Sequence, residues 1–280
     1  RPGRVEIHIE INTLDKDARK YFLDNIIKKK PTSGRFDMKK LLMYTTGFTG
    51  AQLELLGKEA SFHCLRHGLP AITQDILIDQ INRIKYGEKQ TYLSPEQIFE
   101  ETAIYEAGRA VISKVLMPHV SIEHISLTPR ANNEHFISHN YQDVQDNMTV
   151  KDFKDKICVS LAGRTAQIKQ FGEIDGMDTG ASNDLQQATR DAYAAIAHYG
   201  MDKEVGYINI NGVIDAKANS ITTKHYYVKI ENALERWMLE GEKNVIGLVD
   251  EHWDTIENLS KLLLEKEIMY EEELDKILAR

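Results

Sequence analysis

The chain has 280 residues, of which 42% are hydrophobic, and this is enough apolar material for about two ordinary domains. Its formal charge of −8 argues against a general nucleic-acid surface, which would be basic, so no nucleic-acid partner is expected. No run of about 18 apolar residues is present, so no membrane-spanning helix is predicted. The cysteines Cys64 and Cys158 lie in separate helical patterns and are expected to be free thiols in a reducing compartment.

The first part of the chain predicts one strand followed by a helical bundle. Residues 5–11 alternate apolar and polar side chains with period two, as in a strand with one buried face. Asp15, Thr49 and Thr73 are the expected N-caps of three helices that run to about residues 30, 67 and 85. A short helix is predicted between them at 38–43. Short connections join these helices, which predicts a compact bundle over residues 11–88.

The second part predicts a mainly helical domain that contains a small sheet. A polar linker at residues 89–93 precedes Ser94 and Pro95, a serine cap and first-turn proline that are typical of a helix start. That helix is predicted to run to about residue 116. The further predicted strands cover residues 122–128, 134–141 and 205–210. The further predicted helices cover 150–171, 179–199, 222–240, 244–265 and 271–278. The fold class is therefore predicted to be mainly α with a small β-sheet.

The helical stretch at residues 102–112 carries a pattern of chemical interest. Tyr105 and Arg109 are four residues apart, so they share one face of the helix, with Glu106 beside them. A zinc protease places two metal-binding histidines at this spacing, with a glutamate between them as general base. Here the glutamate is present, and both histidine positions hold other residues.

Three further segments complete a family resemblance. They are residues 47–51 (Gly-Phe-Thr-Gly-Ala), 161–166 (Leu-Ala-Gly-Arg-Thr-Ala) and 179–185 (Thr-Gly-Ala-Ser-Asn-Asp-Leu). With the 102–112 stretch they occur in an order that resembles the FtsH family, in which an AAA+ ATPase and a zinc protease share one chain. The resemblance covers essentially the whole chain. It implies the end of an AAA+ core at 1–10, an AAA+ helical lid at 11–88 and an FtsH-like peptidase domain at 94–280.

The resemblance assigns family roles to individual positions of this chain. The family's three zinc ligands correspond to Tyr105, Arg109 and Asp184, and its general base corresponds to Glu106. A further glutamate of the family corresponds to Gln167. One ligand and the base are therefore retained, whereas two ligands and a nearby carboxylate are replaced.

These replacements predict a site without zinc. Catalytic zinc needs about three protein ligands, arginine offers only hydrogen-bond donors, and tyrosine must lose a proton with a pKa near ~10. Without zinc, no activated water is available to Glu106. We therefore expect no zinc and no proteolysis. We hypothesise that the Arg109 guanidinium lies near the former metal position and pairs with Asp184, Glu106 or both, and that the hydroxyl of a half-buried Tyr105 is hydrogen-bonded.

The resemblance also implies nucleotide-related positions. Gly50 and Ala51 match residues that line the nucleotide in the family, and Arg1 and Arg4 match arginines that reach a neighbouring subunit's γ-phosphate. The chain begins without methionine, and we expect the Walker motifs to lie upstream in a longer protein. ATP and Mg²⁺ are therefore expected as cofactors of the full-length protein only.

The leading interpretation is a pseudoprotease whose former peptidase domain serves as a hexamerisation scaffold or as a platform for substrates and partners. One alternative is a functional zinc endopeptidase with unusual ligands, and another is an inactive subunit in a mixed ring with an active paralogue. The expected partners are a homohexamer or a mixed FtsH hexamer, together with protein substrates or adaptors. We expect residues 1–280 to be soluble, with a membrane anchor in the preceding part. The expected location is the cytoplasmic side of a bacterial inner membrane, or alternatively an organelle membrane.

Overall fold

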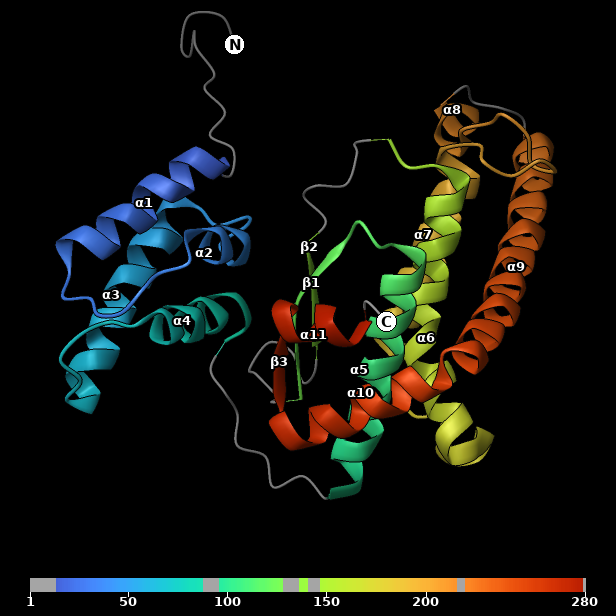
Figure 1. The fold of residues 1–280 in the computed structure, drawn as a ribbon. Helices are drawn as coiled ribbons and strands as arrows, with labels where there is room; N and C mark the ends of the chain where they lie inside the picture. The colour runs from blue at the N-terminus through green and yellow to red at the C-terminus, as the bar shows by residue number, and fades with distance from the viewer. Residues whose placement is uncertain (1–13, 88–95, 128–135, 141–146, 216–219, 279–280) are drawn as a thin grey trace, which may run out of the picture. The chain divides into compact units, whose positions relative to one another are not determined.

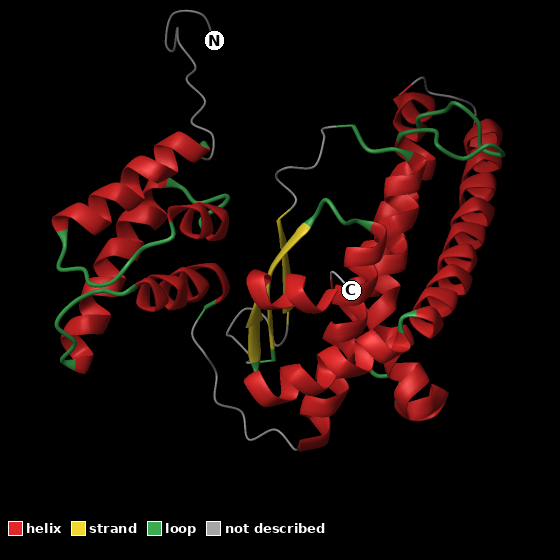
Figure 2. Ribbon diagram, viewed as in Figure 1, coloured by secondary structure: helices red, strands yellow, loops and turns green. Residues whose placement is uncertain are grey.

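The computed structural model describes residues 14–87, 96–127, 136–140, 147–215 and 220–278 (Figure 1). The chain divides into two compact units, whose described residues are 14–87 and 96–278 with the gaps just given. Helices dominate both units, and the second contains a small three-stranded sheet (Figure 2). The predicted fold class, mainly α with a small β-sheet, is confirmed. The predicted strand at 5–11 and the linker at 89–93 lie outside the described residues.

The described part of the first unit is a bundle of four helices. They are α1 (Lys16–Lys29), α2 (Met38–Tyr44), α3 (Gly50–His67) and α4 (Gln74–Tyr86). The three predicted N-caps are confirmed: the side chains of Asp15, Thr49 and Thr73 accept hydrogen bonds from backbone amides of the first turns. Gly68 ends α3 in the left-handed conformation, with φ of 63°, which favours glycine because it has no Cβ. The core of this bundle contains the buried side chains of Leu23, Leu41, Leu53, Leu56, Leu77 and Ile81.

The second unit is built around α5 (Glu96–Leu116) and α6 (Val150–Asp175). Helix α7 (Ser182–Tyr193) continues into a π-helical turn, η1 (Ala194–His198). The remaining helices are α8 (Ile210–Asp215), α9 (Ser220–Glu251), α10 (Trp253–Lys266) and α11 (Glu271–Leu278). As Figure 1 shows, the long helix α9 lies beside α6 and α7, with which it packs.

The sheet has the order β2-β1-β3, and both pairings are antiparallel. Strands β1 (Ser121–Ser126) and β2 (Phe136–Asn140) correspond to the predicted strand pair. The third strand, β3 (Ile268–Tyr270), was not predicted, because three residues are too few to display an alternating pattern. It pairs with β1 and places Met269 opposite Ile125 in the core.

Close helix packing depends on glycines, and one of them accounts for a wrong prediction. We predicted a break between two helices at residues 241–243, but α9 continues through Gly241 to Glu251. A Cβ at Gly241 would lie 2.8 Å from Cγ2 of Ile157 on α6, so this glycine allows α9 and α6 to approach each other closely. The break between α9 and α10 lies at His252 instead.

The predicted strand at residues 205–210 is also wrong. This segment forms a turn that leads into α8, and Asp202 fastens the turn to α9. Oδ2 of Asp202 accepts hydrogen bonds from Arg236 Nη2 at 2.7 Å and from Trp237 Nε1 at 2.9 Å. Its Oδ1 accepts from the backbone amides of Glu204 and Val205. Side-chain anchoring to a helix, rather than pairing with a strand, satisfies this turn.

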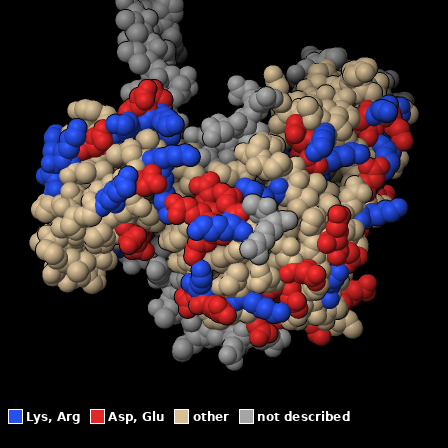
Figure 3. All heavy atoms as spheres, in the orientation of Figure 1, with Lys and Arg blue, Asp and Glu red and all other residues tan. Residues whose placement is uncertain are grey.

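Charged side chains of both signs occur at the surface. On the face drawn in Figure 3, Lys and Arg side chains are interspersed with Asp and Glu side chains. Within the part of the chain that the structure describes, no helix is both long enough and apolar enough to cross a membrane.

The Asp202 anchor predicts an acid-sensitive contribution to stability. Burial would raise the pKa of Asp202, but hydrogen bonds from Arg236, Trp237 and the two amides outweigh burial and lower it. This contribution is fully present above the unfolded pKa of ~3.9 and is lost as the pH falls through the lower folded value. Asp202→Asn should reduce the free energy of unfolding by ~2–4 kcal/mol at pH 7 in urea denaturation.

Glu204→Gln is the control for this prediction. Glu204 also pairs with Arg236, at 2.7 Å, but its side chain is 69% exposed, so the loss should stay below ~1 kcal/mol. Equal losses in the two variants would contradict the role given to Asp202.

Candidate functional site

The structure brings together four of the residues singled out in the sequence. Tyr105, Glu106 and Arg109 lie on α5, and Asp184 lies in the first turn of α7. Their side chains meet where α7 approaches α5, and the four residues are called the α5–α7 cluster below.

The contacts within the α5–α7 cluster centre on Asp184 and Arg109. The Tyr105 hydroxyl donates a hydrogen bond to Oδ2 of Asp184. Arg109 Nη1 lies 3.4 Å from Oε2 of Glu106, and Arg109 Nε lies 3.3 Å from Oδ2 of Asp184. The predicted pairing of Arg109 is therefore confirmed for both carboxylates. The predicted hydrogen bond of Tyr105 is confirmed as well, although its side chain is more deeply buried than expected, at 8% exposed.

Burial controls the protonation of this cluster. Glu106 is 1% exposed, and burial raises its pKa to about 7, against the opposing effect of Arg109 and with a further increase from Asp184. Burial and the neighbouring Asp184 carboxylate also raise the pKa of Tyr105. Tyr105 therefore stays protonated at neutral pH, which is the state in which it can donate a hydrogen bond to Asp184.

A glycine on α6 makes room for the tyrosine ring. A Cβ at Gly163 would lie 2.6–2.7 Å from three ring carbons of Tyr105. One α5 turn further along, a Cβ at Gly108 would lie 2.6 Å from Cβ of Ala166. Sequence reasoning singled out residues 161–166 as a family segment but missed this role. The pairing of a small residue with a large one across two helices becomes visible only once the helices are packed.

Gln167 bonds to groups outside the α5–α7 cluster. Its Nε2 donates to the backbone carbonyl of Glu101 at 3.2 Å and to Oδ2 of Asp178 at 3.4 Å. Oδ1 of Asp178 in turn accepts from the amide of Gly180, in the segment that leads into α7. Both partners of Gln167 Nε2 are acceptors, so an amide suits this position, whereas an ionised carboxylate would be repelled. Sequence reasoning did not identify Asp178.

The positions that the family resemblance relates to nucleotide binding lie outside the α5–α7 cluster. Gly50 and Ala51 form the first turn of α3 in the other compact unit. Arg1 and Arg4 lie outside the described residues. The roles of these four residues in nucleotide binding therefore stay predictions from the sequence.

The α5–α7 cluster does not fit zinc coordination. Only Glu106 and Asp184 could donate carboxylate oxygens, and the Arg109 cation lies within 3.4 Å of both. No group of three His, Cys, Asp or Glu residues that could hold a metal ion occurs among the residues that the structure describes. A catalytic zinc site uses about three such ligands and has no permanent cation in contact with them.

Comparison with known proteins identifies the class to which this fold belongs. The profile of peptidase family M41 matches residues 93–277, and the chain therefore belongs to that family. The ATP-dependent zinc metalloprotease FtsH 1 of Thermoanaerobacter sp. is 29% identical over 289 residues, covering 99% of this chain and 46% of the relative. The corresponding FtsH of Thermus thermophilus is 30% identical over 283 residues, with 99% and 45% coverage. The chain thus spans less than half the length of these relatives.

The close contact at Gly163 predicts a destabilising substitution. Gly163→Ala should reduce the free energy of unfolding by ~1–3 kcal/mol, because the added methyl group would displace the Tyr105 ring from the helix interface. Gly247→Ala on the exposed side of α9, where no atom lies within 4 Å, should be neutral or stabilising by up to ~1 kcal/mol. Chemical denaturation of the two variants measures the difference. A neutral Gly163→Ala would contradict the packing described here.

The raised pKa of Glu106 predicts a pH-dependent effect on stability. Its folded value of about 7 lies above the unfolded value of ~4.3, so its contribution is fully present below pH ~4 and is lost as the pH rises through 7. Glu106→Gln removes the cost of burying the ionised carboxylate at high pH. It also removes the ion pair with Arg109, but the cost of burial is the larger of the two effects. The variant should be ~1–3 kcal/mol more stable than the parent at pH 8 and closer to it at pH 5.

Thermal or urea unfolding at the two pH values measures this effect. Glu100→Gln, at an exposed position of α5, is the matched control and should change little at either pH. A Glu106→Gln variant that is less stable than the parent at both pH values would rule out the proposed effect of burial.

Proposed function

We propose that this chain is the C-terminal part of an FtsH-like AAA+ protein whose peptidase domain acts without zinc-dependent hydrolysis. In this proposal the domain serves as a hexamerisation scaffold and as a platform for protein substrates or partners of the ATPase. Membership of peptidase family M41 supports the architecture. The observation that carries the proposal is that Arg109 forms ion pairs with both Glu106 and Asp184.

The chemistry of these contacts disfavours peptide hydrolysis. A general base must accept a proton from water that a metal has made acidic, and the Arg109 guanidinium cannot act as a Lewis acid in that way. The carboxylate of Asp184 is occupied by Tyr105 and Arg109, and that of Glu106 by Arg109. An incoming metal ion would have to displace Arg109 from both carboxylates. It could then bind Glu106 and Asp184, and these four residues would offer it no third carboxylate, histidine or cysteine ligand.

The same contacts support a structural role for the α5–α7 cluster. In a zinc site, a metal bound by α5 and α7 would cross-link the two helices. Here the hydrogen bond from Tyr105 and the ion pair from Arg109 connect α5 to Asp184 on α7. Such a connection keeps the helices in place without a metal, which is what a scaffold that does not cleave peptides requires.

The remaining parts of the proposal concern the longer protein. The relatives are described as ATP-dependent zinc metalloproteases and align with 99% of this chain, which supports an AAA+ lid in the first unit. An ATPase that binds ATP and Mg²⁺, a hexameric or mixed ring and a membrane anchor would then belong to the full-length protein. Gly50, Ala51, Arg1 and Arg4 would contribute near the nucleotide.

An alternative function is that of an active zinc peptidase with unusual ligands. It is favoured by the description of the relatives as zinc metalloproteases and by the retention of Glu106 beside Asp184. This alternative requires Arg109 to leave both carboxylates and Tyr105 to ionise in spite of its raised pKa. Metal analysis separates the two functions.

The test compares zinc content with peptidase activity. After incubation with ZnCl₂ and desalting, the chain should retain well below one zinc per molecule by elemental mass spectrometry. The double variant Tyr105→His with Arg109→His should retain about one, because two histidines and Asp184 restore the ligand set. Even so, this variant in the full-length protein should not readily cleave casein, because Gln167 replaces the family's carboxylate.

Two results would overturn the proposal. One is stoichiometric zinc in the unmodified chain that is lost on Asp184→Ala. The other is casein cleavage by the full-length protein that a zinc chelator abolishes. Zinc binding by the double variant is the positive control for the first measurement.

A further inference from the structure

The family segment at residues 161–166 has two faces, and the α5–α7 cluster uses only one of them. Gly163 and Ala166 pack against α5, opposite Tyr105 and Gly108. Leu161 and Arg164 line a hollow that opens among α6, α7 and α9. Arg164 therefore belongs to a motif that the site described above leaves unexplained.

The hollow among α6, α7 and α9 has a largely apolar lining. Its volume is about 240 Å³, which is below the ~300–1,000 Å³ of sites that hold small-molecule ligands. This space suits one or two apolar side chains better than an entire small molecule. The apolar residues that line it are Leu161, Ile168, Met177, Leu185, Met238 and Leu239.

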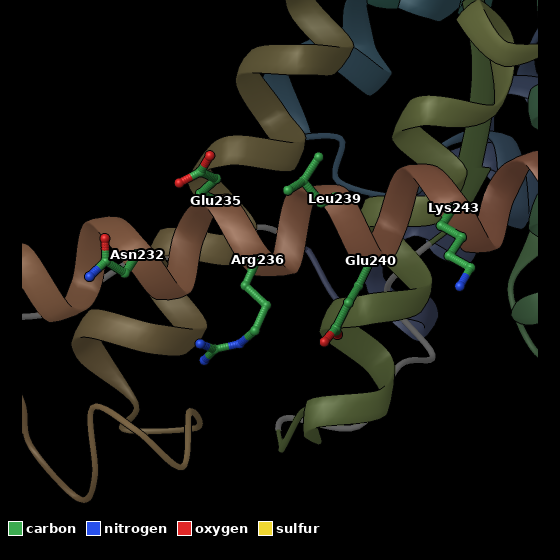
Figure 4. A pocket seen from close by; sticks show the side chains of 6 residues that line it. All are labelled: Asn232, Glu235, Arg236, Leu239, Glu240 and Lys243. Atoms are coloured by element: carbon green, nitrogen blue, oxygen red, sulfur yellow. The ribbon is translucent and has the colours of Figure 1, made fainter.

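Two of these apolar side chains are well exposed to solvent. Leu239 is 57% exposed and Met177 is 48% exposed, although both lie against other apolar groups. Leu239 also borders a second hollow, along α9. In Figure 4, Leu239 points to one side of this helix, whereas Arg236 and Glu240 point to the other. Contiguous exposed apolar groups mark surfaces that receive a partner, and these two side chains border the same hollow.

The charges around the hollow indicate what the partner carries. Arg164 is a partly buried residue, and no described residue forms a hydrogen bond or an ion pair with its guanidinium. Thr165 cannot serve as a polar anchor as readily, because its hydroxyl already donates to the Leu161 carbonyl at 2.9 Å. Glu242 also lines the hollow but is well exposed, so water screens its charge. A guanidinium on a partly buried residue that lines a largely apolar hollow favours a carboxylate.

We propose that this hollow docks a short segment of a partner protein, in which one or two apolar side chains fill the space and a neighbouring Asp or Glu pairs with Arg164. The proposal rests on the proposed role of the domain as a platform for proteins, and it names the chemistry that the platform recognises. The small volume argues against a lipid chain. Arg164, which pairs with no residue in the described part of the chain, argues against a purely apolar segment.

The test uses an array of acetylated hexapeptides with Leu, Met or Phe at the apolar positions and Asp, Asn or Lys at the central position. Peptides with Asp should bind at least about tenfold more tightly than those with Asn. Arg164→Glu should abolish this preference and shift it toward Lys. Leu239→Ser should weaken all binding. The control Glu231→Gln, at an exposed position of α9 that does not line the hollow, should change affinity less than about twofold.

Several results would overturn the proposal. One is the absence of binding by every Asp peptide, and another is an unchanged preference for Asp in Arg164→Glu. A third is a variant whose sedimentation coefficient differs from that of the parent chain while its peptide binding does not. The last result would assign the hollow to a second copy of the chain. If Arg164→Glu fails to fold by circular dichroism, Arg164→Met keeps the apolar stem and must still lose the preference for Asp. Zinc content is measured on the same samples, so failure of the proposed function is distinguished from failure of this inference.

Discussion

The ion pairs of Arg109 with Glu106 and Asp184 are the contacts on which the centre of the peptidase domain depends. Two carboxylates from different helices are held close together in a poorly solvated place, and their repulsion would be large without a cation. Arg109 supplies that cation, and the Tyr105 hydroxyl supplies a second contact to Asp184. Because burial still raises the pKa of Glu106 to about 7, the compensation is incomplete and the cluster is sensitive to pH.

The position of the α5–α7 cluster follows from how closely the helices approach. Gly108 and Gly163 remove side-chain bulk between α5 and α6, and Gly241 does the same between α6 and α9. The ring of Tyr105 occupies the space above Gly163, which places its hydroxyl within reach of Asp184. The small residues of α6 thus make room for the Tyr105 ring at the centre of the α5–α7 cluster.

Helix α6 connects the two proposals. One face supports the cluster that joins α5 to α7, and another face forms part of an apolar hollow that contains Arg164. A domain with these properties can hold its own architecture and still present a surface to other proteins. Peptide hydrolysis would require zinc at the α5–α7 cluster. Docking of a partner requires only that the hollow beside Arg164 stay accessible. The two roles can therefore be separated by mutation.

The sequence by itself determined the fold class, the helix caps at Asp15, Thr49 and Thr73, and the three neighbouring residues of the cluster on α5. Local hydrogen bonds and helical spacing specify these features. The spacing on α5 put Tyr105, Glu106 and Arg109 together, and the family resemblance added Asp184. The contacts of Gln167, the strand β3 and the continuation of α9 through Gly241 were decided by tertiary structure alone. They depend on which segment packs against which. In a sequence, a glycine such as Gly241 indicates a helix break, whereas in the folded chain it allows two helices to pack closely.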